Sequence, residues 1–114
     1  MKRKNTISEN YLEKIPKINV MNFSVDEKNI ITLEIENKGL ANKLAQKILK
    51  KPKITYIHLD KFGSFVWSSI DGEKTIIDIG KDVEKEFGDA ANPLYERLAK
   101  YFEILKSYDF ISFK

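Results

Sequence analysis

The chain has 114 residues, of which 42% are hydrophobic and 32% are charged, and its formal net charge is +3. This length and apolar share predict one domain with a core of its own. The absence of cysteine excludes disulfides, thiolate metal sites and thiol nucleophiles. No apolar run is long enough to span a bilayer, and no apolar signal core follows the basic N-terminal residues, so we expect a cytoplasmic protein.

The charge is distributed unevenly along the chain. Residues 1–53 hold 12 of the 20 lysines and arginines but only 6 of the 17 acidic residues, so the second half is acidic. The most concentrated feature is a run of six lysines from Lys38 to Lys53 with no acid among them. A solvated helix face is the simpler interpretation of this run, and contact with a nucleic-acid backbone is the alternative.

The N-terminal third of the sequence predicts an arm followed by a hairpin. Residues 1–16 mix charged and small polar side chains up to Pro16, which is typical of a flexible arm, either mobile or loosely docked, and we expect the folded domain to occupy residues 17–114. Residues 17–25 and 29–36 are rich in β-branched and aromatic side chains and predict paired strands. The alternation of apolar and polar residues in the second stretch predicts one buried and one wet face.

A basic helix and a third strand are predicted next. Leu40, Leu44 and Ile48 recur every four residues among lysines, which predicts an amphipathic helix over residues 39–51, ended by Pro52. Residues 54–59 then predict a third strand, and Asp60 is placed to cap whatever helix follows.

Two short amphipathic helices follow, each with start and end signals. The first is rich in aromatic residues and meets an Asp71-Gly72 stop. The second begins at Thr75, whose hydroxyl can accept a hydrogen bond from a free amide of the first turn, and Gly88 ends it. Asp78, three residues after the cap, favours the positive end of the helix dipole.

A third helix and an apolar tail complete the chain. Asn92 is predicted as the helix cap, and Pro93 as the first helical residue, where its missing N–H has no cost. The tail is predicted to fold back on the core through Phe110, Ile111 and Phe113. Together these elements predict an α+β domain of winged helix-turn-helix-like arrangement, in which a three-stranded antiparallel sheet packs on a three-helix bundle, with the basic helix as an insertion.

The chain offers few groups for catalysis or metal binding. His58 is the single histidine, and transition-metal sites usually recruit several His or Cys ligands. No nucleophile signature surrounds Ser64, Ser68 or Ser69, which we interpret as helix-surface serines. The glycines are scattered singly and form no phosphate-binding loop. We therefore expect no metal, no cofactor and no enzymatic activity.

The third helix carries a second strip beside its core-facing one. At about 100° per residue, Arg97, Lys100, Tyr101, Ile104 and Tyr108 fall on one flank. This strip is either a widened core face or one wall of a groove beside the third strand. In a groove, an incoming peptide could add as an extra strand, with backbone hydrogen bonds for affinity and side-chain pockets for selectivity.

The helical half resembles the PqqD-like family, the peptide chaperones named after coenzyme PQQ synthesis protein D. The shared order is a third strand, an aromatic helix ending in Asp-Gly, a Thr at the start of the next helix, and a last helix closing on an apolar pair. This resemblance covers roughly residues 54–111 and is carried by Leu59, Phe65, Trp67, Asp71-Gly72, Thr75-Ile76, Ile79, Phe87, Phe102, Leu105 and Phe110-Ile111.

The resemblance implies a non-catalytic recognition element for ribosomally made, modified peptides. Such proteins bind the leader segment of a precursor peptide between the third strand and the third helix and present it to a modifying enzyme, in the PQQ pathway a radical SAM enzyme. Carried over by position, the peptide-binding residues are Tyr56, Ile57, His58, Arg97, Lys100, Tyr101 and Ile104. A winged-helix nucleic-acid binder and a structural subunit of a larger enzyme are the alternatives, and homodimerisation is left open.

Overall fold

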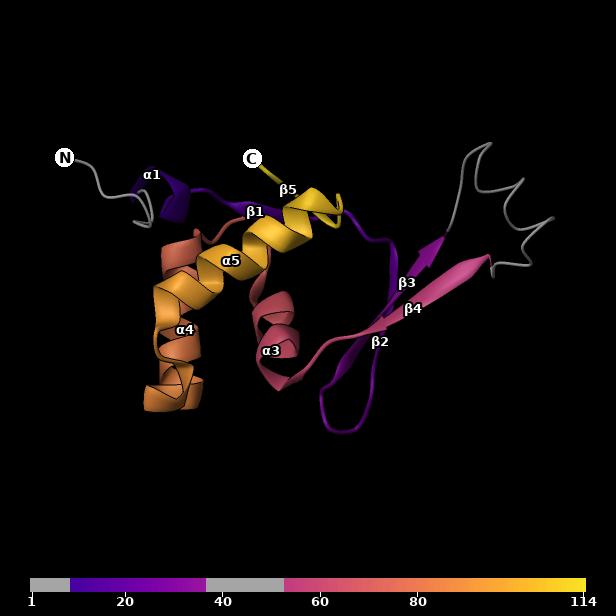
Figure 1. The fold of residues 1–114 in the computed structure, drawn as a ribbon, viewed down its shortest axis with the longest axis horizontal. Helices are drawn as coiled ribbons and strands as arrows, with labels where there is room; N and C mark the ends of the chain where they lie inside the picture. Colours follow the sequence, from indigo (N-terminus) through magenta and orange to yellow (C-terminus); the bar gives the residue numbers. More distant parts are fainter. Residues whose placement is uncertain (1–8, 37–52) are drawn as a thin grey trace.

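A computed structural model describes residues 9–36 and 53–114 (Figure 1). The basic helix that the sequence predicts over residues 39–51 lies outside the described residues. Within them, the elements run in the order α1 (Glu9–Leu12), β1 (Pro16–Ile18), β2 (Asn22–Val25), β3 (Ile31–Glu36), β4 (Ile54–His58), α3 (Lys61–Ser69), α4 (Ile76–Phe87), a 3-10 turn (Gly88–Ala91), α5 (Leu94–Ser107) and β5 (Ile111–Phe113). None of the helices in these two ranges is long and apolar enough to span a bilayer.

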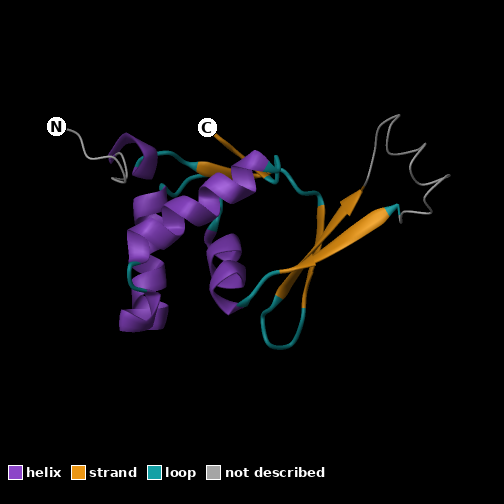
Figure 2. Cartoon of the chain, viewed as in Figure 1, coloured by secondary structure: helices purple, strands orange, loops and turns teal. Residues whose placement is uncertain are grey.

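The main sheet has three antiparallel strands in the order β2-β3-β4, which confirms the predicted α+β class and the three-stranded sheet. Leu33 at its centre pairs with Phe23 on one side and Ile57 on the other. Ile31 and Leu33 are fully buried, as their alternation predicts, and they join Val66 of α3 in the core. Figure 2 shows the sheet extending to one side of α3, with α4 and α5 on the other.

The N-terminal strands differ from the prediction of one strand over residues 17–25. Pro16–Ile18 (β1) pairs with the C-terminal β5 in a separate two-stranded sheet, and only Asn22–Val25 joins the main sheet. The backbone leaves β1 at Asn19, whose N–H donates to Phe110 O and whose side-chain amide donates to Asp109 O. A long-range pairing therefore divides a stretch that is continuous in local strand propensity.

Part of the segment predicted as an arm contacts the domain. Pro16 is buried as the first residue of β1, and the ring of Tyr11 in α1 lies edge-on to Phe113 at a centroid distance of 5.7 Å. The described end of this segment therefore lies beside the folded-back tail. That tail is confirmed, since Ile111 in β5 is fully buried.

The helix signals are mostly confirmed. Asp60 caps α3 by accepting from the Gly63 N–H at 2.7 Å, and Thr75 and Asp78 form the reciprocal capping box that starts α4. Gly88 ends α4 with a positive φ of 59°, which a glycine adopts without strain.

Two helix boundaries are corrected. α3 ends at Ser69, ahead of the predicted Asp71-Gly72 stop, and the Asp71 carboxylate instead accepts from the N–H groups of the two residues that follow Gly72. α5 begins at Leu94 with Pro93 before it, and no side chain caps this end. Pro93 thus precedes the helix, whereas the sequence predicts it as the first helical residue.

Ser64 joins the sheet to α3. It is buried, not on the helix surface as predicted: its Oγ accepts from the Ile31 N–H at 2.9 Å and lies 3.4 Å from Leu59 O. Leu59 N in turn donates to Ile31 O at 2.9 Å. Ile31 thus bonds through its C=O to Leu59 and through its N–H to the Ser64 hydroxyl of α3. The sheet therefore cannot shift relative to α3 without breaking the bond to Ser64.

We predict that Ser64→Ala lowers the free energy of unfolding by about 1–3 kcal/mol, because the buried Ile31 N–H would lose its partner. Urea denaturation followed by circular dichroism measures this. Ser68→Ala, on the exposed side of the same helix, is the matched control and should change the value by less than about 0.5 kcal/mol. Equal effects of the two substitutions would contradict the bridging role.

Candidate functional site

A hollow of about 440 Å³ lies between the start of α3 and the outer flank of α5. It collects four of the seven residues that the sequence predicts for peptide binding, namely Arg97, Lys100, Tyr101 and Ile104. The other four lining residues are ones that the sequence does not single out for binding: Asp60, Phe62, Pro93 and Glu96. The three predicted residues of β4 lie outside this lining.

Arg97 forms a fixed part of the wall. Its guanidinium lies 4.0 Å from the centre of the Phe62 ring, and its Nη1 donates to Ala90 O at 3.0 Å. A guanidinium over an aromatic face gains electrostatic attraction while its flat surface covers the ring. Arg97 therefore supports the aromatic floor of the hollow in addition to supplying positive charge.

Tyr101 closes the side of the hollow toward α3. Its hydroxyl donates to Gly63 O at 3.1 Å, and its ring lies edge-on to Phe62 at a centroid distance of 6.3 Å. Burial raises the pKa of the Tyr101 phenol, and the negative charge of Asp60 raises it further. A methyl group at Gly63 would lie only 2.8 Å from the Tyr101 oxygen, so the approach of α5 to α3 requires the glycine.

Ile104 and Lys100 are the predicted residues that remain open to a ligand. Ile104 is 47% exposed, and Lys100 is exposed one helical turn earlier. Glu96 lies one turn before Lys100 in the same lining. The hollow thus offers an apolar surface bordered by charges of both signs, Arg97 and Lys100 against Asp60 and Glu96.

Strand β4 supplies a sheet edge next to this hollow. It pairs with β3, and no second strand among residues 9–36 and 53–114 pairs with it. Because the Leu59 N–H bonds to Ile31 O, the alternation of an antiparallel ladder directs the backbone groups of Ile57 toward β3 and those of Tyr56 and His58 to the outer edge. The chain then passes through Leu59 to Asp60, where the lining of the hollow begins.

The side chains of the three predicted strand residues point to two faces of the sheet. Ile57 packs against the core, on the same face as the helices. Tyr56, 58% exposed, and His58 lie on the opposite face, where the His58 Nδ1 shares a 2.7 Å hydrogen bond with the Thr32 hydroxyl. Tyr56 and His58 can therefore meet a ligand through their outward backbone groups, while the hollow lies toward the helices.

Phe62 is the lining residue with a signal in the sequence, because it lies on the apolar face of the first predicted helix. Its role in the hollow depends on packing with α5, which the sequence pattern does not reveal.

No group of three or more His, Asp or Glu side chains in the described parts of the chain is arranged to hold a metal ion.

Comparison with known proteins gives one family match. The family model described as coenzyme PQQ synthesis protein D (PqqD) matches residues 42–111, which is more than half of the chain. The matched range contains β4, α3, α4 and α5, and thus both walls of the candidate site. No curated protein and no solved structure shows significant similarity to the chain.

We predict that the free energy of unfolding falls as the pH rises above about 10, where an unfolded tyrosine loses its proton while Tyr101 keeps it. A raised pKa in the folded state stabilises the fold below the unfolded pKa, and this contribution is lost above it. Burial raises the pKa of Tyr11 to about 12, so it adds to the same trend. Tyr101→Phe should make the decrease shallower, as measured by urea denaturation at about pH 8 and pH 11.

At pH 8, Tyr101→Phe should cost about 1 kcal/mol, because the hydrogen bond to Gly63 O is lost. The control Tyr108→Phe, at a ring that is 64% exposed, should leave the stability at pH 8 unchanged. A decrease above pH 10 that is equally steep in Tyr101→Phe and in the original chain would contradict this account of Tyr101.

Proposed function

The chain belongs to the PqqD family, the family of coenzyme PQQ synthesis protein D, and on this premise we propose that it binds the leader segment of a ribosomally made precursor peptide. In this proposal the chain presents the peptide to a modifying enzyme, such as a radical SAM enzyme, in the cytoplasm. The chain itself supplies no catalytic group and needs no cofactor. Its contribution is to hold an extended segment where another protein can act on it.

The observation that carries the proposal is the continuity between an edge strand and a hollow. The outward N–H and C=O groups of Tyr56 and His58 can pair with an extended peptide, and the hollow begins at Asp60, two residues farther along. Each such backbone hydrogen bond contributes a net of about 0.5–1.5 kcal/mol. Pairing alone is insensitive to sequence, so selectivity must come from the hollow.

The hollow supports selection of an apolar side chain. In an added strand, alternate side chains point to the helix side, where Ile104 and Phe62 present apolar surface. Burying one Leu, Ile or Phe side chain contributes about 1.5–3 kcal/mol. Lys100 and Glu96 at the rim then favour peptides whose flanking charges are correctly placed.

The family membership does not favour the nucleic-acid-binding alternative. Most of the lysines on which that alternative depends lie in residues 37–52, outside the described residues. In the described part, α4 carries Asp78, Asp82, Glu84 and Glu86 against Lys81 and Lys85, a composition that repels phosphate.

We predict that Tyr56→Pro weakens leader-peptide binding at least tenfold relative to Tyr56→Ala, because proline removes the outward N–H whereas alanine keeps it. Both variants lose the ring, so their difference isolates the backbone bond. The residue before proline prefers extended backbone, which β4 already has. Titration of the 15N-labelled protein with a candidate leader peptide measures affinity and should shift the amides of residues 54–59 and 97–104.

A second pair of variants tests the hollow. Ile104→Glu should weaken the same peptide about tenfold or more through loss of apolar contact, whereas Tyr108→Glu, at an exposed position near the end of α5, should leave binding unchanged. Equal affinities of the proline and alanine variants at position 56 would exclude strand addition at β4. Unchanged binding by Ile104→Glu would exclude the hollow as a pocket for the peptide.

A further inference from the structure

The opposite edge of the main sheet has an exposed apolar face. Met21, Phe23 and Val25 are 87%, 40% and 54% exposed, although Phe23 and Val25 pair with the buried Leu33 and Ile31 and share their face of the sheet. All four residues of β2 are exposed. α3 covers this face only in part, because the Phe23 ring lies edge-on to Trp67 of α3 at a centroid distance of 5.8 Å while Met21, Phe23 and Val25 all remain exposed.

The backbone of β2 is also directed outward. Asp26 N donates to Ile30 O, so ladder alternation turns Ser24 toward β3 and Val25 toward the outer edge. No second strand in the described ranges pairs with β2. Residues 18–25 hold no charged side chain in a chain that is 32% charged. Exposed edges usually carry charges or prolines that oppose pairing, and this one has neither.

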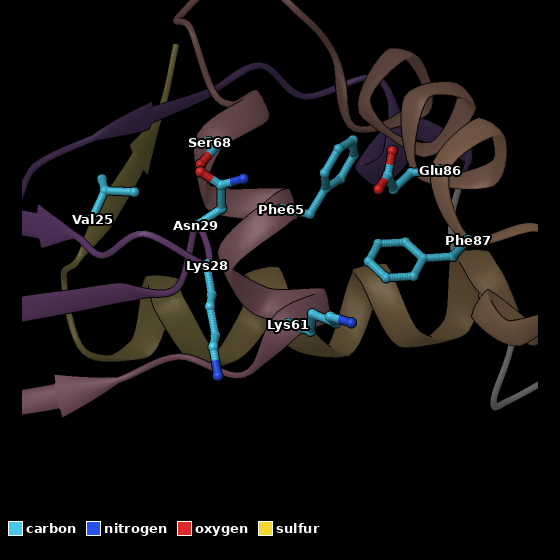
Figure 3. A pocket seen from close by; sticks show the side chains of 8 residues that line it. All are labelled: Val25, Lys28, Asn29, Lys61, Phe65, Ser68, Glu86 and Phe87. Carbon is cyan, nitrogen blue, oxygen red and sulfur yellow. The ribbon is translucent and has the colours of Figure 1, made fainter.

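A second hollow, of about 560 Å³, lies beside this edge (Figure 3). It is bounded by Val25, Lys28 and Asn29 of the hairpin and by residues of α3 and α4. Figure 3 shows Phe65 and Phe87 between these two helices, and their ring centroids are 5.6 Å apart. The apolar face of β2 therefore continues toward an aromatic floor.

The charges around this hollow have both signs. Lys28 and Lys61 line it together with Glu86. A surface of one sign would repel its own copy and attract an oppositely charged partner, whereas a mixed surface can be complementary to itself across a two-fold axis. With the uncharged strand, this balance favours a second copy of the chain over an acidic or a basic partner.

We propose that β2 pairs antiparallel with β2 of a second copy, which joins two sheets into one of six strands. The outward backbone groups of Phe23 and Val25 would form the new ladder. The apolar side chains of both copies would lie on the same face above the two hollows. In this dimer β4 of each copy remains an outer edge, so the interface does not depend on the proposed peptide site and leaves it open.

The test is the mass of the full chain in solution. Sedimentation equilibrium from about 1 μM to about 1 mM covers the affinity range of modest interfaces and should show a monomer–dimer equilibrium. Val25→Pro removes an outward N–H without removing a bond to β3, and Met21→Lys places a charge on the exposed face. Each should weaken dimerisation at least tenfold while the circular dichroism spectrum stays unchanged.

Tyr56→Pro, at the other sheet edge, is the matched control and should dimerise like the original chain. A chain that stays monomeric throughout the concentration range would overturn the proposal. So would a dimer that neither β2 variant weakens, or one that only Tyr56→Pro weakens, since the interface would then lie elsewhere. Peptide titration of the monomeric β2 variants should give the original affinity, so the dimer and the peptide site can fail independently.

Discussion

The candidate site depends on the close packing of α5 against two glycines, Gly63 and Gly80. A Cβ at Gly63 would lie 2.8 Å from the Tyr101 hydroxyl, and a Cβ at Gly80 would lie 2.5 Å from the Tyr95 ring. Both separations are too short for carbon, so α5 reaches α3 and α4 only because these positions carry no side chain. One contact lies on each neighbouring helix. Together they fix the depth at which α5 packs and, with it, the shape of the hollow.

The packing of α5 engages polar side chains in contacts within the protein, and these side chains would otherwise be free to bind a ligand. The Tyr101 hydroxyl is bonded to Gly63 O, and the Arg97 guanidinium is held by the Phe62 ring and by Ala90 O. These groups form a preorganised wall, while Ile104 stays exposed for contact. A wall that is already ordered loses little conformational entropy when a peptide binds, so more of the contact energy remains as affinity.

The sequence predicts what depends on neighbours along the chain. Asp60, Thr75 and Gly88 cap helices as predicted because capping involves only three or four consecutive residues. The four site residues of α5 fall on one flank for the same reason, since helical spacing is local. The burial of Ser64 and the division of residues 17–25 between two sheets result from contacts with distant residues. No local pattern encodes such contacts. The position of Phe62 beside α5 likewise depends on a contact with distant residues, so the sequence does not predict it.

The bond from the Ile31 N–H to Ser64 Oγ relates the sheet edge to the hollow. Ser64 lies in the first turn of α3, one residue after Gly63, which receives the Tyr101 hydrogen bond. The sheet, α3 and α5 are therefore joined through two consecutive residues. An extended segment on β4 would meet the hollow in a fixed register, because the strand and the helix wall cannot slide separately. A one-residue slip reverses which side chains of a strand face the helices, so in the proposed binding mode this junction would let apolar residues at alternate positions of a peptide be distinguished from polar ones.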